Sequence, residues 1–280
     1  MRFIRLSAEG RILNILKIIT LIGISINVYS YTIGLENEST PILTRHNDFF
    51  EFWSMSKAIW SGFVDRIYDV KAFSAYQLDL QGGKSSFILP NFYPPSFLFF
   101  VLPLSLGPFL VMAHVWIFGT LALFATLGQG RRWSGRRALV LLAAPSTMVT
   151  MAAGQTGFLT AALLGGGLGL LRTHPVAAGV CLGLVTIKPH LALLAGVALL
   201  AARAWRAILA AALTFATLAG LSAAAFGPEL WLDWVRVLPQ AWEMNLAAFD
   251  RLGGFMPTLT GALLKLGTPL AVAKTAQTLA

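Results

Sequence analysis

The sequence predicts an all-α protein, a polytopic bundle of membrane helices with short broken helices and interfacial helices on the outer face. Apolar residues make up 56% of the 280 residues, and only 12% are charged. A typical soluble domain is about 45–50% apolar with glycine included and about 25% charged. A soluble globule could not bury this much apolar surface beneath a charged shell. The single cysteine, Cys181, excludes a disulfide or cysteine-based zinc scaffold.

The charged residues are segregated along the chain, which carries a net charge of +9. Basic residues form short clusters between apolar runs, of which RRWSGRR at 131–137 is the densest. This pattern is typical of the cytoplasmic loops of membrane proteins, and no basic stripe interleaved with aromatics suggests nucleic-acid binding. Of the 12 acidic residues, seven lie within 34–93 and four within 228–252. Those two stretches are where we expect polar chemistry.

The first apolar run, Ile18 to Gly34, is long enough to span a membrane. A cleavable signal peptide is the alternative, but no small-x-small cleavage site follows and further apolar runs come later. With the N-terminus inside, residues 34–93 form an outer loop. We therefore expect one transmembrane domain over residues 1–280, with the candidate active site on an interfacial helix of this loop.

The next apolar stretch is interrupted by Pro103 and Gly107-Pro108. We expect Ser96–Leu106 to form a short helix at the outer interface and Pro108–Leu127 to cross the membrane. One crossing returns the basic cluster at 131–137 to the inside, in agreement with the positive-inside rule.

Three shorter apolar segments follow, Ala138–Met151, Gly157–Leu171 and Val176–Ile187. Each is shorter than the roughly 20 residues of a full span. Their polar breaks, at Gly154-Gln155 and Lys188-Pro189-His190, both fall on the outer side by alternation. Irregular backbone at membrane depth is tolerated only where it lines a cavity or packs within protein. Each break is therefore expected either to line a cavity on the outer side or to pack within protein there.

The last part of the chain is predicted to cross outward at Ala207–Phe226. The stretch at 228–252 contains three tryptophans and suits an amphipathic helix at the membrane interface. The chain is then expected to re-enter at Phe255–Leu266. Because Ala280 lies inside another apolar segment, we expect the sequence to be a C-terminally truncated part of a longer protein.

The outer loop holds the densest group of polar side chains. A helix is predicted from Asn47 to about Trp60, and the three-and-four spacing places Asp48 and Glu51 on one face. Asp48 is a carboxylate at a helix start beside aromatic residues. It could act in chemistry or serve as an N-cap, a position that aspartate favours. Arg45, just upstream, could pair with it or face solvent.

Four further polar residues lie at the corners and breaks of the apolar segments. Lys188 is costly inside apolar sequence and marks a substrate path, unless it snorkels to the outer headgroups. His190 could donate to a phosphate or be an ordinary interface histidine. Gln155 could hydrogen-bond a sugar hydroxyl or merely close its loop. Tyr93 stands in a stiff corner before two prolines.

No nucleotide-binding or metalloprotease motif is present, so the sequence predicts no cofactor and no metal site. The polar groups instead suit a reaction between a lipid phosphate and a hydroxyl acceptor. A transporter or flippase of a lipid-linked sugar would also use a broken-helix cavity and an intramembrane cation. We see no repeated halves, however, and the large outer loop is asymmetric. A third possibility is a non-catalytic scaffold descended from an enzyme.

Five motifs occur in a fixed order: HNDFFEFW (46–53), DRIYD (65–69), FYPP (92–95), AAGQTGFL (152–159) and AAGVCLGLVTIKPHLALL (177–194). Together they resemble glycosyltransferase family 87, integral membrane enzymes of the GT-C class that include polyprenol-phosphate-mannose-dependent mannosyltransferases. The resemblance covers roughly residues 44–250. Each motif alone is weak, whereas five in order on a matching hydropathy profile are fairly specific. Family members are usually longer, with further membrane helices after the point where this sequence stops.

The resemblance implies sugar transfer on the outer face of a bacterial inner membrane. The donor would be a polyprenyl-phosphate sugar, with mannose expected, and the acceptor a lipid or glycan hydroxyl. Neither a nucleotide sugar nor a metal would be needed. Asp48 matches the position of the family's catalytic base. Lys188 and His190 are the candidates to meet the lipid phosphate, and Gln155, Tyr93, Glu51 and Arg45 complete the expected substrate-binding set.

Overall fold

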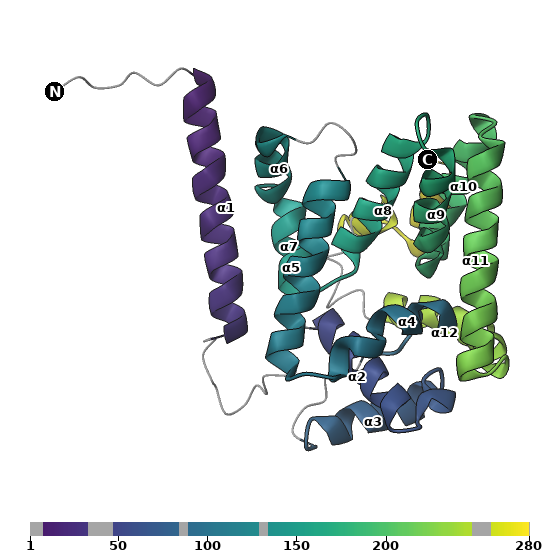
Figure 1. The fold of residues 1–280 in the computed structure, drawn as a ribbon. Helices are drawn as coiled ribbons and strands as arrows, with labels where there is room; N and C mark the ends of the chain where they lie inside the picture. Colours follow the sequence, from purple (N-terminus) through teal and green to yellow (C-terminus); the bar gives the residue numbers. More distant parts are fainter. Residues whose placement is uncertain (1–7, 33–46, 84–88, 129–133, 248–258, 280) are drawn as a thin grey trace. The chain divides into compact units, whose positions relative to one another are not determined.

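The computed structural model describes residues 8–32, 47–83, 89–128, 134–247 and 259–279 (Figure 1). Every regular element in these ranges is helical, which confirms the all-α prediction. The chain divides into two compact units, Met1–Leu232 and Asp233–Ala280.

Two helices of the described residues are long and apolar enough to cross a membrane: α5 (Phe109–Leu127) and α11 (Trp205–Phe226). The first helix, α1 (Ala8–Thr32), has an apolar part at Ile12–Ser25 that is shorter than a span. It packs against α6 and α7. The polytopic arrangement therefore stays a prediction, whereas the helical class is shown.

The outer-loop sequence folds into α2 (Asn47–Trp60), a 3₁₀ turn η2 (Val64–Arg66) and α3 (Val70–Leu80). The predicted end of α2 is confirmed, because Gly62 adopts a left-handed φ of +74° that side chains rarely tolerate. Asp69 caps α3 by accepting a hydrogen bond of 3.0 Å from the Ala72 amide.

The segment after the double proline is more broken than predicted. In place of one short helix at Ser96–Leu106, the chain forms η3 (Pro95–Phe97), α4 (Leu98–Val101) and η4 (Leu102–Ser105). Pro103 lacks an N–H group and interrupts the helical ladder. The three short elements pack against one another, and α2 packs against α4 and η4.

The predicted continuous segment Ala138–Met151 was wrong, because the chain divides there into α6 (Gly135–Leu142) and α7 (Pro145–Ala153). Proline disfavours a helical conformation in the residue before it, and Ala144 is accordingly extended, with a ψ of 137°. The next helix, α8 (Gly157–Leu170), agrees with its prediction to within one residue and packs against α5.

Small residues bring α9 (Pro175–Leu184) close to α11, beside which it lies in Figure 1. A Cβ added at Gly183 would lie 2.7 Å from the Ala211 carbonyl oxygen, so this position requires glycine. Close approach through small residues is typical of helix pairs in membranes. A 3₁₀ turn, η5 (Val185–Ile187), and α10 (Pro189–Ala201) follow, with Lys188 between them.

The predicted interfacial helix at 228–252 corresponds to α12 (Glu229–Ala247), and the residues after it lie outside the described ranges. In the second unit, α14 (Leu259–Lys265) and α15 (Leu270–Leu279) pack against each other. The described part of the predicted re-entry at Phe255–Leu266 is α14, a helix of seven residues.

Candidate functional site

Five of the predicted site residues meet at one place, although most of them come from distant parts of the chain. Asp48 Oδ2 accepts a hydrogen bond of 2.8 Å from Gln155 Nε2. Gln155 Oε1 in turn accepts one of 2.8 Å from the Tyr93 hydroxyl. Lys188 Nζ lies 5.7 Å from the centroid of the Tyr93 ring, within cation–π range. We call Asp48, Glu51, Tyr93, Gln155, Thr156 and Lys188 the carboxylate cluster.

The buried face of α2 anchors the two carboxyl groups. Phe49, Phe52 and Met55 are fully buried. The Phe52 ring packs edge-on against the Tyr93 ring, with centroids 5.4 Å apart. It also packs against the Trp116 ring, with centroids 5.6 Å apart. Such aromatic contacts contribute specific geometry in addition to buried area. Asp48 and Glu51 are thereby held one turn apart on a fixed helix.

The break between α7 and α8 brings Gln155 to α2. Gly154 has a φ of +66°, and a Cβ added there would lie 2.7 Å from Phe49 Cβ. The Gly154 carbonyl oxygen accepts a hydrogen bond of 2.9 Å from Trp116 Nε1. Glycine is therefore required both by the left-handed conformation and by the close approach to α2.

The corner before the prolines fixes Tyr93. Its amide donates to Asn91 Oδ1 at 2.9 Å, and its carbonyl oxygen accepts from the Tyr68 hydroxyl at 2.6 Å. Its ring stacks on Phe97, with centroids 4.2 Å apart. Backbone and ring are both held, so the hydroxyl has a defined direction.

Burial raises the pKa of both carboxyl groups, and it raises that of Glu51 further. Burial raises the pKa of Asp48 above its usual value, and the Lys188 charge and the Gln155 hydrogen bond oppose that rise. Glu51 is 7% exposed. Its pKa is raised well above the usual value, first by burial and then by the Asp48 charge, against the attraction of Lys188. Asp48 is therefore the carboxyl that ionises first.

Asp48 lies in the first turn of α2, which begins at Asn47. His190 is exposed in the first turn of α10, and among the described residues no hydrogen bond of the cluster reaches it. Arg45 lies outside the described residues.

Sequence reasoning missed three supporting residues. Thr156, which is fully buried, hydrogen-bonds to Gln155 and contacts the Tyr93 hydroxyl. Tyr68 and Asn91 hold the backbone of Tyr93. All three lie inside or next to the motifs quoted above, so their position in those motifs was the available signal.

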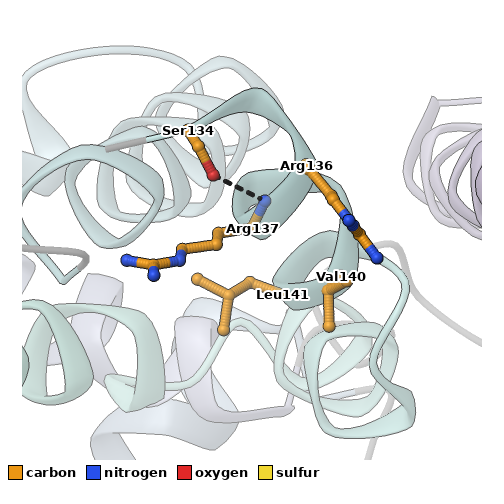
Figure 2. Close-up of a pocket in the computed structure, with 5 residues that line it drawn as sticks. All are labelled: Ser134, Arg136, Arg137, Val140 and Leu141. Atoms are coloured by element: carbon orange, nitrogen blue, oxygen red, sulfur yellow. Dashed lines mark hydrogen bonds between the residues drawn. The ribbon is translucent and has the colours of Figure 1, made fainter. Parts of the chain in front are cut away.

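Hollows lined by described residues also lie on other elements. One, of about 440 Å³, is lined by Ser134, Arg136, Arg137, Val140 and Leu141 at the start of α6 (Figure 2). In Figure 2 the Arg137 side chain extends past Leu141, and the Arg136 side chain extends toward Val140. Another, of about 270 Å³, is an apolar groove between α9, α10 and α11. Its lining includes Thr186 and Ala192, on either side of Lys188 in the chain.

The carboxylate cluster combines an ionisable carboxylate, a nearby cation and hydroxyl and amide donors. Such a set can accept a proton from a hydroxyl and stabilise a developing negative charge. Within the described residues, no group of three or more histidine, cysteine or acidic side chains is placed to hold a metal ion.

Comparison with curated proteins and with solved structures gives no match. The sequence model of glycosyltransferase family 87 matches residues 91–280, more than half of the chain. The matched part contains Tyr93, Gln155 and Lys188, and it begins after Asp48 and Glu51. The hydrogen bond between Gln155 and Asp48 therefore joins the matched part to the outer-loop helix that precedes it. With this match, the chain belongs to glycosyltransferase family 87, whose members are membrane-associated glycosyltransferases.

Proposed function

We propose that this glycosyltransferase moves a sugar, with mannose expected, from a polyprenyl-phosphate donor to a hydroxyl of a lipid or glycan. The observation that carries the proposal is the position of Asp48. It is a partly buried carboxylate, hydrogen-bonded by Gln155, with the Lys188 cation near enough to influence its ionisation. The Asp48 carboxylate suits the acceptor hydroxyl, and the Lys188 cation suits a phosphate.

The proposed reaction is a single inverting displacement. Asp48 accepts the proton of the acceptor hydroxyl while that oxygen forms a bond to the anomeric carbon. The bond between the anomeric carbon and the phosphate oxygen breaks, and its electron pair leaves with the polyprenyl phosphate. A phosphate leaving group requires charge stabilisation more than protonation.

Lys188 is proposed to provide that stabilisation, with His190 two residues further on as a hydrogen-bond donor to the phosphate. The apolar groove between α9, α10 and α11 supports a lipid-linked donor, since its lining residues Thr186 and Ala192 flank Lys188 in the chain. An isoprenoid chain bound there would bring its phosphate toward the lysine.

We further propose a multi-pass GT-C-type bundle in a bacterial inner membrane, with the cluster on the outer face. The two long apolar helices, the shorter apolar helices between polar breaks and the basic clusters support this topology. Single cysteines at the exposed Asp65 or Lys71, in a Cys181→Ala background, should react with an impermeant thiol reagent added outside. Labelling that requires access from the cytoplasmic side would overturn the topology.

The test of function compares the full-length protein with Asp48→Asn in liposomes that contain radiolabelled polyprenyl-phosphate mannose and a lipid extract of the source membranes. Asp48→Asn removes the base with little change in volume, so label should enter a new glycolipid only with the wild type. Asp65→Asn, an exposed aspartate of the same loop, is the matched control and should transfer normally.

Other outcomes decide between the alternatives. Near-normal turnover by Asp48→Asn would end the assignment of the base. If label crosses the bilayer unchanged, the protein is a transporter of the lipid-linked sugar. If neither protein transfers label while a known mannosyltransferase does, the donor sugar is not mannose.

A further inference from the structure

The amide of Gln155 is fixed by its neighbours in a single orientation. Its Oε1 accepts three hydrogen bonds, from the Tyr93 hydroxyl at 2.8 Å, the Thr156 amide at 2.8 Å and the Thr156 hydroxyl at 3.0 Å. A backbone N–H can only donate, so the side-chain atom facing it must be the oxygen. The Nε2 group is consequently directed at Asp48.

The backbone that carries Gln155 is equally constrained. Gly154 is held by Trp116 and lies against Phe49, and Thr156 is fully buried. The amide is therefore positioned by the protein, because Tyr93 and Thr156 donate three hydrogen bonds to its oxygen and its nitrogen donates one to Asp48. A residue that mainly contacted a sugar hydroxyl would not need three protein donors on its oxygen.

We propose that Gln155 is the positioning residue of the base: its amide holds Asp48 Oδ2 and leaves Oδ1 to take the proton of the acceptor hydroxyl. This inference rests on the proposed function and specifies which oxygen of Asp48 reacts. It also differs from the expectation that Gln155 binds substrate.

The proposal has a consequence for the pH dependence of transfer. Among the described residues, Lys188 before α10 and Gln155 from the α7–α8 break act on the Asp48 carboxyl, and Glu51 on α2 and Tyr93 interact with it. A hydrogen bond donated to a carboxylate favours its ionised form. Loss of the Gln155 donor should raise the pKa of Asp48, and the acid limb of the activity profile should move to higher pH.

The experiment uses two substitutions of similar volume. Gln155→Met removes both donor and acceptor. Gln155→Glu keeps the acceptor for Tyr93 and Thr156 but, when ionised, places a second carboxylate against Asp48. If Gln155 only closes its loop, Gln155→Glu should be the more active variant. If it positions the base, both variants should lose roughly ten- to a hundredfold in kcat/KM at neutral pH, and Gln155→Glu should be the worse.

Gln77→Met is the matched control. Gln77 is a fully buried amide, and it bonds to the Leu89 carbonyl and amide at 2.9 and 2.8 Å and not to Asp48. It should lower stability without displacing the pH profile. An equal loss by Gln155→Met at every pH, or an unshifted profile with a raised KM for acceptor or donor, would overturn the proposal.

A second readout does not depend on the substrate. A hydrophobic carbodiimide reacts with protonated carboxyl groups, and peptide mass spectrometry can follow its attachment to Asp48 against pH. The midpoint should lie at higher pH in Gln155→Met than in the wild type and in Gln77→Met. An unchanged midpoint would overturn the positioning role. A shifted midpoint in a protein that transfers no sugar would leave Gln155 as the partner of Asp48 and reject the proposed function alone.

Discussion

The carboxylate cluster and the basic start of α6 are both rich in charge, yet they are built in opposite ways. The cluster draws its residues from four separate parts of the chain, and Gln155 and Asp48 bond across 107 residues of sequence. Arg136 and Arg137 are adjacent and exposed on one helix, where Ser134 caps the Arg137 amide at 3.2 Å (Figure 2). The Ser134 cap joins residues three positions apart in the sequence, whereas the cluster requires the folded chain.

The difference shows why charge density by itself does not identify a site. An exposed arginine stays hydrated, and its removal changes little in stability. A buried carboxyl is poorly hydrated, so each neighbouring donor or cation alters its protonation. Substitutions in the cluster should therefore change pH dependence and activity, and those at α6 should not. The following predictions test that contrast.

Gly154→Ala should have the largest effect. It adds a Cβ 2.7 Å from Phe49 Cβ at a φ of +66°, so the break must move away from α2 and Gln155 must leave Asp48. The left-handed conformation and overpacking together should cost about 2–4 kcal/mol, with transfer activity lost. The measurements are unfolding in detergent and the liposome assay.

Gly62→Ala is the control, because Gly62 has a φ of +74° but nothing within 4 Å of an added Cβ. It should cost only about 1–2 kcal/mol and keep activity. Equal effects of the two substitutions would show that the approach of Gly154 to α2 does not matter.

Lys188→Ala should come next, with the KM for the donor raised about tenfold or more and the KM for the acceptor changed much less. The physical reason is loss of the cation proposed to meet the phosphate. Lys57→Ala removes a lysine from α2 whose Nζ lies 5.1 Å from the Trp53 ring, and it should leave both values close to the wild type. An unchanged donor KM in Lys188→Ala would favour a snorkelling lysine.

Glu51→Gln should change how stability depends on pH. Above the usual glutamate pKa of 4.5, an unfolded chain releases the Glu51 proton whereas the folded protein retains it, because its pKa is raised. The folded state then binds more protons, so stability falls as pH rises toward the folded pKa. Glutamine abolishes this slope. Unfolding midpoints measured in detergent should show that the stability of Glu51→Gln increases relative to the wild type as pH rises. If the stabilities of the two proteins depend on pH in the same way, Glu51 is not buried in its neutral form. Glu229→Gln, at an exposed position, is the control.

Arg136→Ala combined with Arg137→Ala should have the smallest effect. Both side chains are exposed, so stability should stay within about 0.5 kcal/mol and the pH profile of transfer should not move. A displaced profile would show that the basic region is electrically coupled to the cluster, and the contrast between the two regions would fail.

Several local features followed from short-range sequence rules. The bounds of α2 and the breaks at Gly154-Gln155 and Lys188 were predicted, because glycine, proline and helical periodicity act over a few residues. The break at Pro145 was not predicted, although proline disfavours a helical conformation in the residue before it. The continuous helix expected after the double proline was also wrong, since Pro103 divides it into short turns.

The sequence by itself determined the helical class, the position of the polar breaks and the family. It also identified Asp48, Gln155, Tyr93 and Lys188 as residues of interest, because polar groups stand out against an apolar background. It left open whether Gln155 meets a sugar or closes a loop. The fold brings its amide to Asp48 and places three donors on its oxygen. Contacts across more than a hundred residues depend on packing, and here the close approach of Gly154 to Phe49 decides them.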